Sequence, residues 1–162
     1  MQAVDVYVDG SYSKARPGIC RGAAVILVDG KPVYAQNYII QKSAFVSMNN
    51  VGGELWAAIS AIQIVQGLFK DEPVLLTIYH DYKGIRNFVQ GPEKWTPKKD
   101  GAVMYTYVMQ EYIKSHPEST LAFKKVAAHT GDKWNEIVDD LSRGDVSSEI
   151  NDVYKGCMTF KE

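Results

Sequence analysis

Acidic residues stand at several points where the sequence predicts the end of a strand or the beginning of a helix. Asp9 follows the alternating apolar stretch 4–8 and precedes a glycine-containing turn. Asp81 follows the apolar stretch 74–79, and Glu54 falls in the first turn of a predicted helix. Ligand sites of α/β sheets gather at such strand ends, so these three carboxylates form a candidate ligand site. A turn or helix-capping role remains the alternative for Asp9 and Asp81.

The predicted elements that would position these acids follow the order βββαβααβα. Asp29-Gly30 marks a tight turn, which predicts a hairpin between the second and third strands. In the last helix four apolar residues share one face, which should therefore be buried. They are Trp134, Ile137, Val138 and Leu141. The predicted strands cover residues 4–8, 23–28, 33–40, 74–79 and 121–127, and the predicted helices cover residues 53–66, 83–89, 102–114 and 134–141.

The composition fits one ordinary globular domain and excludes several classes of protein. Of the 162 residues, 46% are hydrophobic and 23% are charged, which is enough for a core that folds unaided. The net charge is −1, so local patches would have to hold any nucleic acid. Cys20 and Cys157 fit neither a zinc site nor a disulfide framework. Because no apolar run is long enough for a signal peptide or a membrane span, we expect a cytoplasmic protein.

Four short segments carry more specific motifs than any single acidic residue. They read Val-Asp-Gly-Ser at 8–11, Asn-Val-Gly-Gly-Glu-Leu at 50–55, Tyr-His-Asp-Tyr-Lys-Gly-Ile at 79–85 and Ala-His-Thr-Gly-Asp-Lys-Trp-Asn-Glu-Ile-Val-Asp at 128–139. In this order they resemble the signature segments of type 1 ribonuclease H, and the resemblance spans about residues 4–143. By this resemblance the chain is most similar to the bacterial forms that often carry an N-terminal hybrid-binding domain, and we expect a form without that domain.

The resemblance implies an α/β fold of the ribonuclease H type. Its sheet should be five-stranded and mixed, with the first three strands antiparallel and with helices on both faces, which agrees with the element order above. We expect the catalytic domain to cover residues 1–144. Residues 145–162 would form a polar C-terminal tail without a strong pattern and of unknown role.

Carried over motif by motif, the resemblance implies a set of catalytic residues, most of which bind metal. The metal ligands are Asp9, Glu54, Asp81 and Asp139, and the remaining catalytic residue is His129. Carboxylate oxygens suit Mg²⁺ or, as a substitute, Mn²⁺, and two such ions about 4 Å apart can activate a water and stabilise the leaving 3′ oxygen. Clustered carboxylates repel one another until a metal neutralises them. His129 would assist proton transfer or the departure of product, since a histidine titrates near neutral pH.

Asp139 has an acidic neighbour, Asp140, that also qualifies as a ligand by position. Both lie off the apolar face of the predicted helix, so helical phase does not separate them. In the family the metal ligand follows an Asn-Glu pair at a fixed interval, which Asn135, Glu136 and Asp139 reproduce. We therefore expect Asp140 to be a solvated surface carboxylate.

The expected substrate-binding residues are Gly10, Ser11, Asn50 and Trp95. By resemblance, the turn at Gly10 and Ser11 and the side chain of Asn50 approach ribose 2′-hydroxyls, the groups by which a protein distinguishes RNA from DNA. A helix-entry or turn role remains the alternative for Asn50. Trp95 lies among three lysines in segment 94–99, which favours contact with the DNA strand, with a solvated loop as the alternative.

The activity implied by the resemblance is hydrolysis of the RNA strand of RNA–DNA hybrids by a monomeric, metal-dependent endonuclease. The family's products carry 5′-phosphate and 3′-hydroxyl ends. One alternative is another nuclease of the same fold, such as a junction resolvase, because a fold alone does not fix the substrate. Another is a catalytically inactive hybrid-binding module, although all the matched acids are present.

Overall fold

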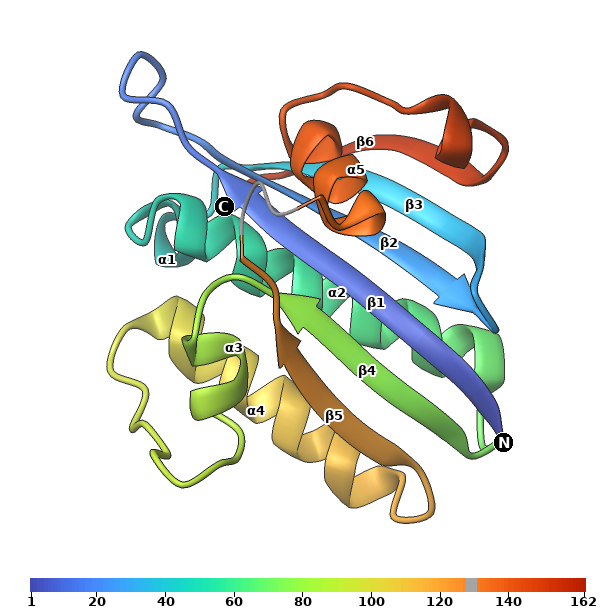
Figure 1. Ribbon diagram of the computed structural model, residues 1–162. Coiled ribbons are helices and arrows are strands. Elements are labelled where there is room, and N and C mark those ends of the chain that lie inside the picture. The colour runs from blue at the N-terminus through green and yellow to red at the C-terminus, as the bar shows by residue number, and fades with distance from the viewer. Residues whose placement is uncertain (128–130) are drawn as a thin grey trace.

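A six-stranded mixed sheet runs through the computed structural model, which describes residues 1–127 and 131–162 (Figure 1). Its strands are β1 (Gln2–Ser11), β2 (Cys20–Val28), β3 (Lys31–Ile40), β4 (Val74–His80), β5 (Thr120–Lys125) and β6 (Tyr154–Phe160). Their spatial order is β5-β4-β1-β2-β3-β6. β2 pairs antiparallel with both β1 and β3, whereas β4 pairs parallel with β1 and with β5. The antiparallel arrangement predicted for the first three strands is therefore confirmed.

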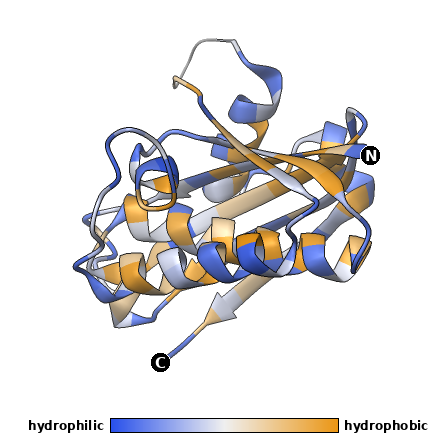
Figure 2. Cartoon of the chain, turned by 90° about the horizontal axis from the view of Figure 1, so that it is seen from below, coloured by the Kyte–Doolittle hydropathy of each residue, from blue (hydrophilic) through white to orange (hydrophobic). Residues whose placement is uncertain are grey.

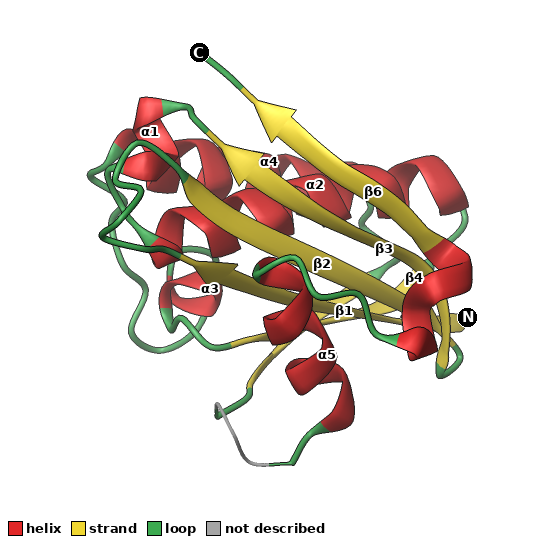
Figure 3. Cartoon of the chain, turned by 90° about the horizontal axis from the view of Figure 1, so that it is seen from above, coloured by secondary structure: helices red, strands yellow, loops and turns green. Residues whose placement is uncertain are grey.

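Helices cover both faces of this sheet (Figures 1 and 3). α2 (Asn50–Phe69) and α4 (Asp100–Ser115) lie on one face, and α5 (Lys133–Ser142) lies on the other. The shorter helices are α1 (Ser43–Val46), α3 (Gly84–Asn87) and the 3-10 helix η1 (Ser148–Val153). Within the described ranges, no helix is both long enough and apolar enough to cross a membrane.

Alternation along β1 divides its side chains between two hydrophobic cores. Val4, Val6 and Val8 are buried in the core that contains α2 and α4, whereas Tyr7 is buried in the core that contains α5. Figure 2 shows the apolar residues running through the central strands and along the helices packed on them. Because side chains alternate along a strand, Asp9 lies on the same face as Tyr7, beneath α5.

The apolar face predicted for the last helix is buried, as its spacing requires. Ile137, Val138 and Leu141 belong to the second core, and Trp134 packs against it at partial burial. The helical period thus orients α5 correctly, with its acidic residues away from the centre of the buried face.

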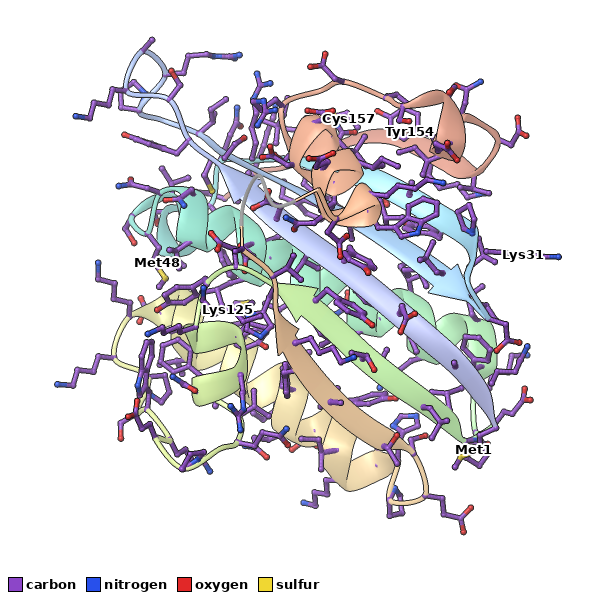
Figure 4. All side chains as sticks on the ribbon, viewed as in Figure 1. Met1, Lys31, Met48, Lys125, Tyr154 and Cys157 are labelled. Atoms are coloured by element: carbon purple, nitrogen blue, oxygen red, sulfur yellow. The ribbon has the colours of Figure 1, made fainter. Side chains whose placement is uncertain are left out.

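The prediction of a five-stranded sheet is wrong, because the C-terminal tail adds β6 at the edge. β6 runs parallel to β3, with Cys157 opposite Asn37 and Phe160 opposite Ile40 (Figure 4 labels Cys157). The Phe160 ring lies 4.3 Å from the Trp56 ring, centroid to centroid, which anchors the end of the strand. The other side chains of β6 are mostly exposed, since an edge strand needs no regular apolar alternation. The sequence pattern therefore gave no sign of this strand.

α2 begins at Asn50, earlier than the predicted start at residue 53, and this shift places Glu54 in the second turn rather than the first. The helix also continues through Gly67, which we expected to end it, to Phe69. Its first turn is pressed against the sheet: a Cβ atom at Gly53 would lie 1.8 Å from the Arg21 carbonyl oxygen. Only glycine permits this approach, which brings the start of α2 to the ends of β1 and β2.

Candidate active site

Asp9 near the end of β1 and Asp81, the residue directly after β4, stand at matching positions of two neighbouring parallel strands. The register pairs Tyr7 of β1 with Tyr79 of β4, so the residues two places further along reach the same level. The two tyrosine rings stack with their centroids 4.2 Å apart, which holds this register on the α5 face. The predicted meeting of these two strand ends is therefore present, and it brings the two aspartates to one edge of the sheet.

Glu54 reaches the same edge from α2, on the other side of the sheet. A Cβ atom at Gly10 would lie 2.6 Å from the Glu54 nitrogen, so the helix backbone touches the strand beside Asp9. The Glu54 carboxylate is buried, and its Oε2 accepts hydrogen bonds from the backbone N–H groups of Asp81 at 3.2 Å and Tyr82 at 3.0 Å. These bonds hold the Glu54 carboxylate beside Asp81.

Asp139 approaches the site from α5, which packs on β1 and β2. Its Oδ1 accepts a hydrogen bond from Nη1 of Arg143 at 2.8 Å, one turn later on the helix, while Nη2 of Arg143 lies 2.9 Å from Oδ1 of Asp140. The Asp139 side chain is 28% exposed and the Asp140 side chain 54% exposed. The less exposed carboxylate is therefore the one expected to be the ligand, and the other lies on the surface.

Two of the acids, Asp9 and Glu54, have raised pKa values, and burial is the largest cause in both. Burial raises the pKa of Asp9 to about 7, and the neighbouring Asp139 and Asp81 raise it as well, against the hydrogen bond from the Gly10 N–H. Burial likewise raises the pKa of Glu54 to about 8, with the charges of Asp9 and Asp81 adding to the effect. This edge of the sheet thus carries more negative charge than it can keep ionised, a state that a bound cation would relieve.

Carboxylate oxygens and a deficit of positive charge fit a hard divalent ion such as Mg²⁺ or Mn²⁺. Across residues 1–127 and 131–162, however, no three His, Cys, Asp or Glu side chains are arranged so that they could hold a metal ion. Glu54 is occupied by backbone N–H groups, and Asp139 by Arg143. The metal-binding role of the four acids therefore stays a prediction, and their chemistry and electrostatic coupling agree with it.

The substrate-binding residues expected near the acids lie where β1, α2 and α5 meet. Ser11 donates a hydrogen bond from Oγ to the Ser142 carbonyl oxygen at 3.0 Å, which ties the end of β1 to the end of α5. Gly10 packs against the first turn of α2, where a Cβ atom would lie 2.0 Å from the Asn50 carbonyl oxygen. Asn50 itself is exposed at the first position of the helix. Gly10 and Ser11 therefore follow Asp9 at the end of β1, with the first turn of α2 packed against Gly10, and the substrate-binding role of the three residues stays a prediction.

Trp95 lies on the α3–α4 side of the acids and is only partly exposed. Its ring meets Phe88 edge-on at 5.6 Å and Tyr82 at 6.1 Å, centroid to centroid. These rings line a pocket of about 630 Å³ together with Lys98 and Lys99. Met48, labelled in Figure 4, and Val51, Thr96 and Ala102 complete its walls. Because Tyr82 directly follows Asp81, this pocket adjoins the acidic edge.

Sequence reasoning missed two residues at this edge, and His129 lies outside the described residues. Arg143 was missed, although its spacing of four residues from Asp139 on a helix is a recognised signal for an ion pair. His80 was also missed: it is 2% exposed, and its Nδ1 lies 3.0 Å from the Tyr82 carbonyl oxygen. It continues the alternation of buried residues along β4, with Val74, Leu76 and Ile78, so strand periodicity could have indicated its burial.

Comparison with known proteins identifies the family of the chain. The family model described as RNase H matches residues 1–147. A ribonuclease H from Neorickettsia sennetsu is 31% identical over 157 residues, which cover 93% of this chain and 97% of that protein. The chain therefore belongs to the ribonuclease H family and is a hydrolase.

Solved structures share the fold at lower sequence identity. The RNase H1 from the halophilic archaeon Halobacterium salinarum NRC-1 has a TM-score of 0.63 at 20% identity, covering 87% of this chain and 95% of that one. The N-terminal RNase H domain of Rv2228c from Mycobacterium tuberculosis has a TM-score of 0.67 at 14% identity, covering 90% of this chain and 99% of that one. Within the family, the protein is a type 1 ribonuclease H.

Proposed function

We propose that the protein is an endonuclease that hydrolyses the RNA strand of RNA–DNA hybrids with the help of two divalent ions. The observation that carries the proposal is the placement of Asp9 and Asp81 at one edge of the sheet, with Glu54 bonded to the Asp81 N–H and Asp139 close enough to Asp9 to raise its pKa. Mg²⁺ is the expected ion, with Mn²⁺ as a substitute. The products would carry 5′-phosphate and 3′-hydroxyl ends.

The four carboxylates would hold the ions, which when bound supply an activated water and stabilise the leaving oxygen. Glu54 and Asp9 have raised pKa values, so near neutral pH each would release a proton as the cation binds. The backbone N–H groups of Asp81 and Tyr82 would keep the Glu54 carboxylate oriented throughout. Arg143 would restrain Asp139 before the substrate arrives.

Selection of the RNA strand would come from groups next to the acids. Ser11 already donates its hydroxyl proton to Ser142, so its oxygen lone pairs are left to accept a hydrogen bond from a ribose 2′-hydroxyl. Asn50 is exposed beside the same turn and offers both a donor and an acceptor. A DNA strand lacks the 2′-hydroxyl and could form neither of these hydrogen bonds.

The DNA strand would pass the pocket that contains Trp95, Lys98 and Lys99. An aromatic ring offers a stacking surface for a sugar or base, and the lysines offer charge to the phosphates. Tyr82, which directly follows Asp81, is one of the residues that line this pocket. Both strands of one hybrid could therefore contact the protein at the same time.

Incubation of labelled substrates with and without each metal tests the proposal. We expect cleavage of a hybrid in Mg²⁺ or Mn²⁺, no cleavage in EDTA, and no cleavage of duplex DNA. A branched DNA substrate that stays intact would contradict the alternative of a junction resolvase. Calorimetric titration with Mg²⁺ addresses the inactive-module alternative, because a module without catalysis need not bind the ion. Exclusive cutting of branched DNA would refute the proposed substrate.

A further inference from the structure

A second pocket, of about 290 Å³, lies at the base of the hairpin that joins β1 and β2. Figure 1 shows this hairpin projecting beyond the sheet at the end where Asp9 stands. The pocket is lined by three guanidinium groups and three hydroxyl groups. They belong to Arg16, Arg21, Arg143, Ser11, Tyr12 and Ser13. Because no carboxylate belongs to its lining, the pocket is locally basic in a chain whose net charge is −1.

Two of the three arginines have charges that nothing near them neutralises. Within the part of the chain that the structure describes, neither Arg16 nor Arg21 forms an ion pair with a carboxylate. Arg21 is half-buried on β2 directly opposite Ser11 on β1, so strand pairing fixes the position of its backbone. A pocket lined by several guanidinium and hydroxyl groups is suited to an oxyanion with several acceptor oxygens, above all a phosphate.

The pocket adjoins the acids that we propose as metal ligands. Ser11 lies two residues beyond Asp9 on the same face of β1, about 7 Å along the strand. Arg143 connects the pocket with the acids, because it lines the pocket and its Nη1 donates a hydrogen bond to Asp139. This short offset is similar to the separation of adjacent phosphates along one nucleic-acid strand. The offset therefore favours a phosphate of the same strand as the phosphate at the acids.

We propose that this arginine pocket binds a backbone phosphate of the RNA strand, next to the phosphate that is cleaved. The identity of the strand depends on the proposed function, whereas the phosphate chemistry does not. Arg16 and Arg21 would neutralise the phosphate, with Ser13 and Tyr12 as further donors. Arg143 would lie between this phosphate and Asp139 and reduce their mutual repulsion.

Titration of the metal-free protein with inorganic phosphate at constant ionic strength tests the pocket without any catalysis. We expect saturable changes in the amide NMR signals of residues 11–21 and of Arg143. Arg16→Gln and Arg21→Gln should each weaken phosphate binding about tenfold, the usual effect of losing a hydrogen bond to a charged group. Lys14→Gln is the matched control, because Lys14 is an exposed cation of the same hairpin outside the pocket lining. Unsaturable changes, or an equal loss in Lys14→Gln, would overturn the proposal.

Cleavage kinetics then test the assignment to the RNA strand. Arg16→Gln and Arg21→Gln should raise KM for a hybrid about tenfold and reduce the dependence of log KM on log salt by about one each, with little effect on kcat. Replacing one RNA phosphate next to the cleaved position by an uncharged methylphosphonate should abolish the difference between wild type and variant. If only a substitution in the DNA strand does so, the strand assignment is wrong. If the wild type cleaves no hybrid, the proposed function fails, and the phosphate titration still decides whether the pocket binds an anion.

Discussion

The Glu54 side chain is bonded to the backbone of Asp81, whose N–H lies 3.2 Å from Glu54 Oε2. This bond joins α2 to the end of β4. It fixes the position of Glu54 relative to Asp81, and both are proposed metal ligands. The N–H groups of Asp81 and Tyr82 stabilise the charged form of Glu54, but burial outweighs them and raises its pKa to about 8. The site is therefore partly organised by the protein backbone.

The metal-free protein should lose stability as pH rises from about 6.5 to 8.5. The pKa values of Asp9 and Glu54, about 7 and about 8, lie above their ordinary values of 3.8 and 4.5, mainly because of burial. Between the ordinary and the raised pKa of each group, the folded state binds more protons than the unfolded state. The free energy of unfolding therefore falls as the pH rises through this range. His80, whose pKa burial lowers to about 4, acts in the opposite sense, but only below about 6.5.

Urea denaturation in EDTA at a series of pH values measures this dependence. Glu54→Gln should flatten the curve, because it removes the group with the higher pKa and keeps an oxygen acceptor for both N–H groups. Added Mg²⁺ should restore stability at pH 8. A wild-type curve that rises from pH 6.5 to 8.5 would mean that these carboxyl groups are not protonated in the folded protein.

Gly10→Ala should destabilise the protein by about 1–3 kcal/mol, the usual cost of overpacking, and should reduce hybrid cleavage. The added Cβ atom would lie 2.0 Å from the Asn50 carbonyl oxygen and would push α2 away from β1. Gly18→Ala is the control, because a Cβ atom there meets nothing within 4 Å. Thermal denaturation of both variants checks the prediction, and equal stability would contradict the close contact between strand and helix.

Asp139→Asn should reduce hybrid cleavage by orders of magnitude, with partial recovery in Mn²⁺, whereas Asp140→Asn should not. Mn²⁺ accepts nitrogen ligands and fewer carboxylates more readily than Mg²⁺. Asp140 is more exposed and pairs with Arg143 at the surface, so its loss should change stability by no more than about 0.5 kcal/mol. Initial rates of the two variants in each metal provide the comparison. If Asp140→Asn is the impaired variant, the register assigned to α5 is wrong by one residue.

His129→Ala should slow turnover without abolishing it. The resemblance implies a role in proton transfer or product release, and neither role requires His129 to bind the metal ions. Steady-state rates across pH 6 to 9 would measure the loss. A defect as complete as that of a missing carboxylate would argue that His129 has a more direct part in the reaction.

Local periodicity was sufficient to predict most of the fold. The alternation of Val4, Val6 and Val8 placed β1, and the spacing of Ile137, Val138 and Leu141 oriented α5, because both elements bury one face. β6 could not be found in this way, since an edge strand carries few buried side chains. The early start of α2 depends on contacts with β1 and β2, which are distant in sequence.

The candidate site was predicted from a different kind of signal. Strand ends drew attention to Asp9 and Asp81, but Asp139 was selected only through the family motif. The structure adds what neither signal contains: the backbone hydrogen bonds to Glu54. These bonds depend on how α2 packs against the end of β4, and a local sequence pattern carries no such information.

The initial rate of hybrid cleavage by wild type, Asp9→Asn and Asp81→Asn at saturating Mg²⁺ tests the central claim most directly. Each substitution removes one charged oxygen ligand with almost no change in volume, so both variants should stay folded by circular dichroism. Asp71 is exposed and precedes β4, at the end of the strand opposite to Asp81. Asp71→Asn therefore serves as the control and should keep the wild-type rate. We predict a rate at least about a thousandfold lower for both test variants. Substantial cleavage by either folded variant would contradict the assignment of these carboxylates as the metal-binding core of the site.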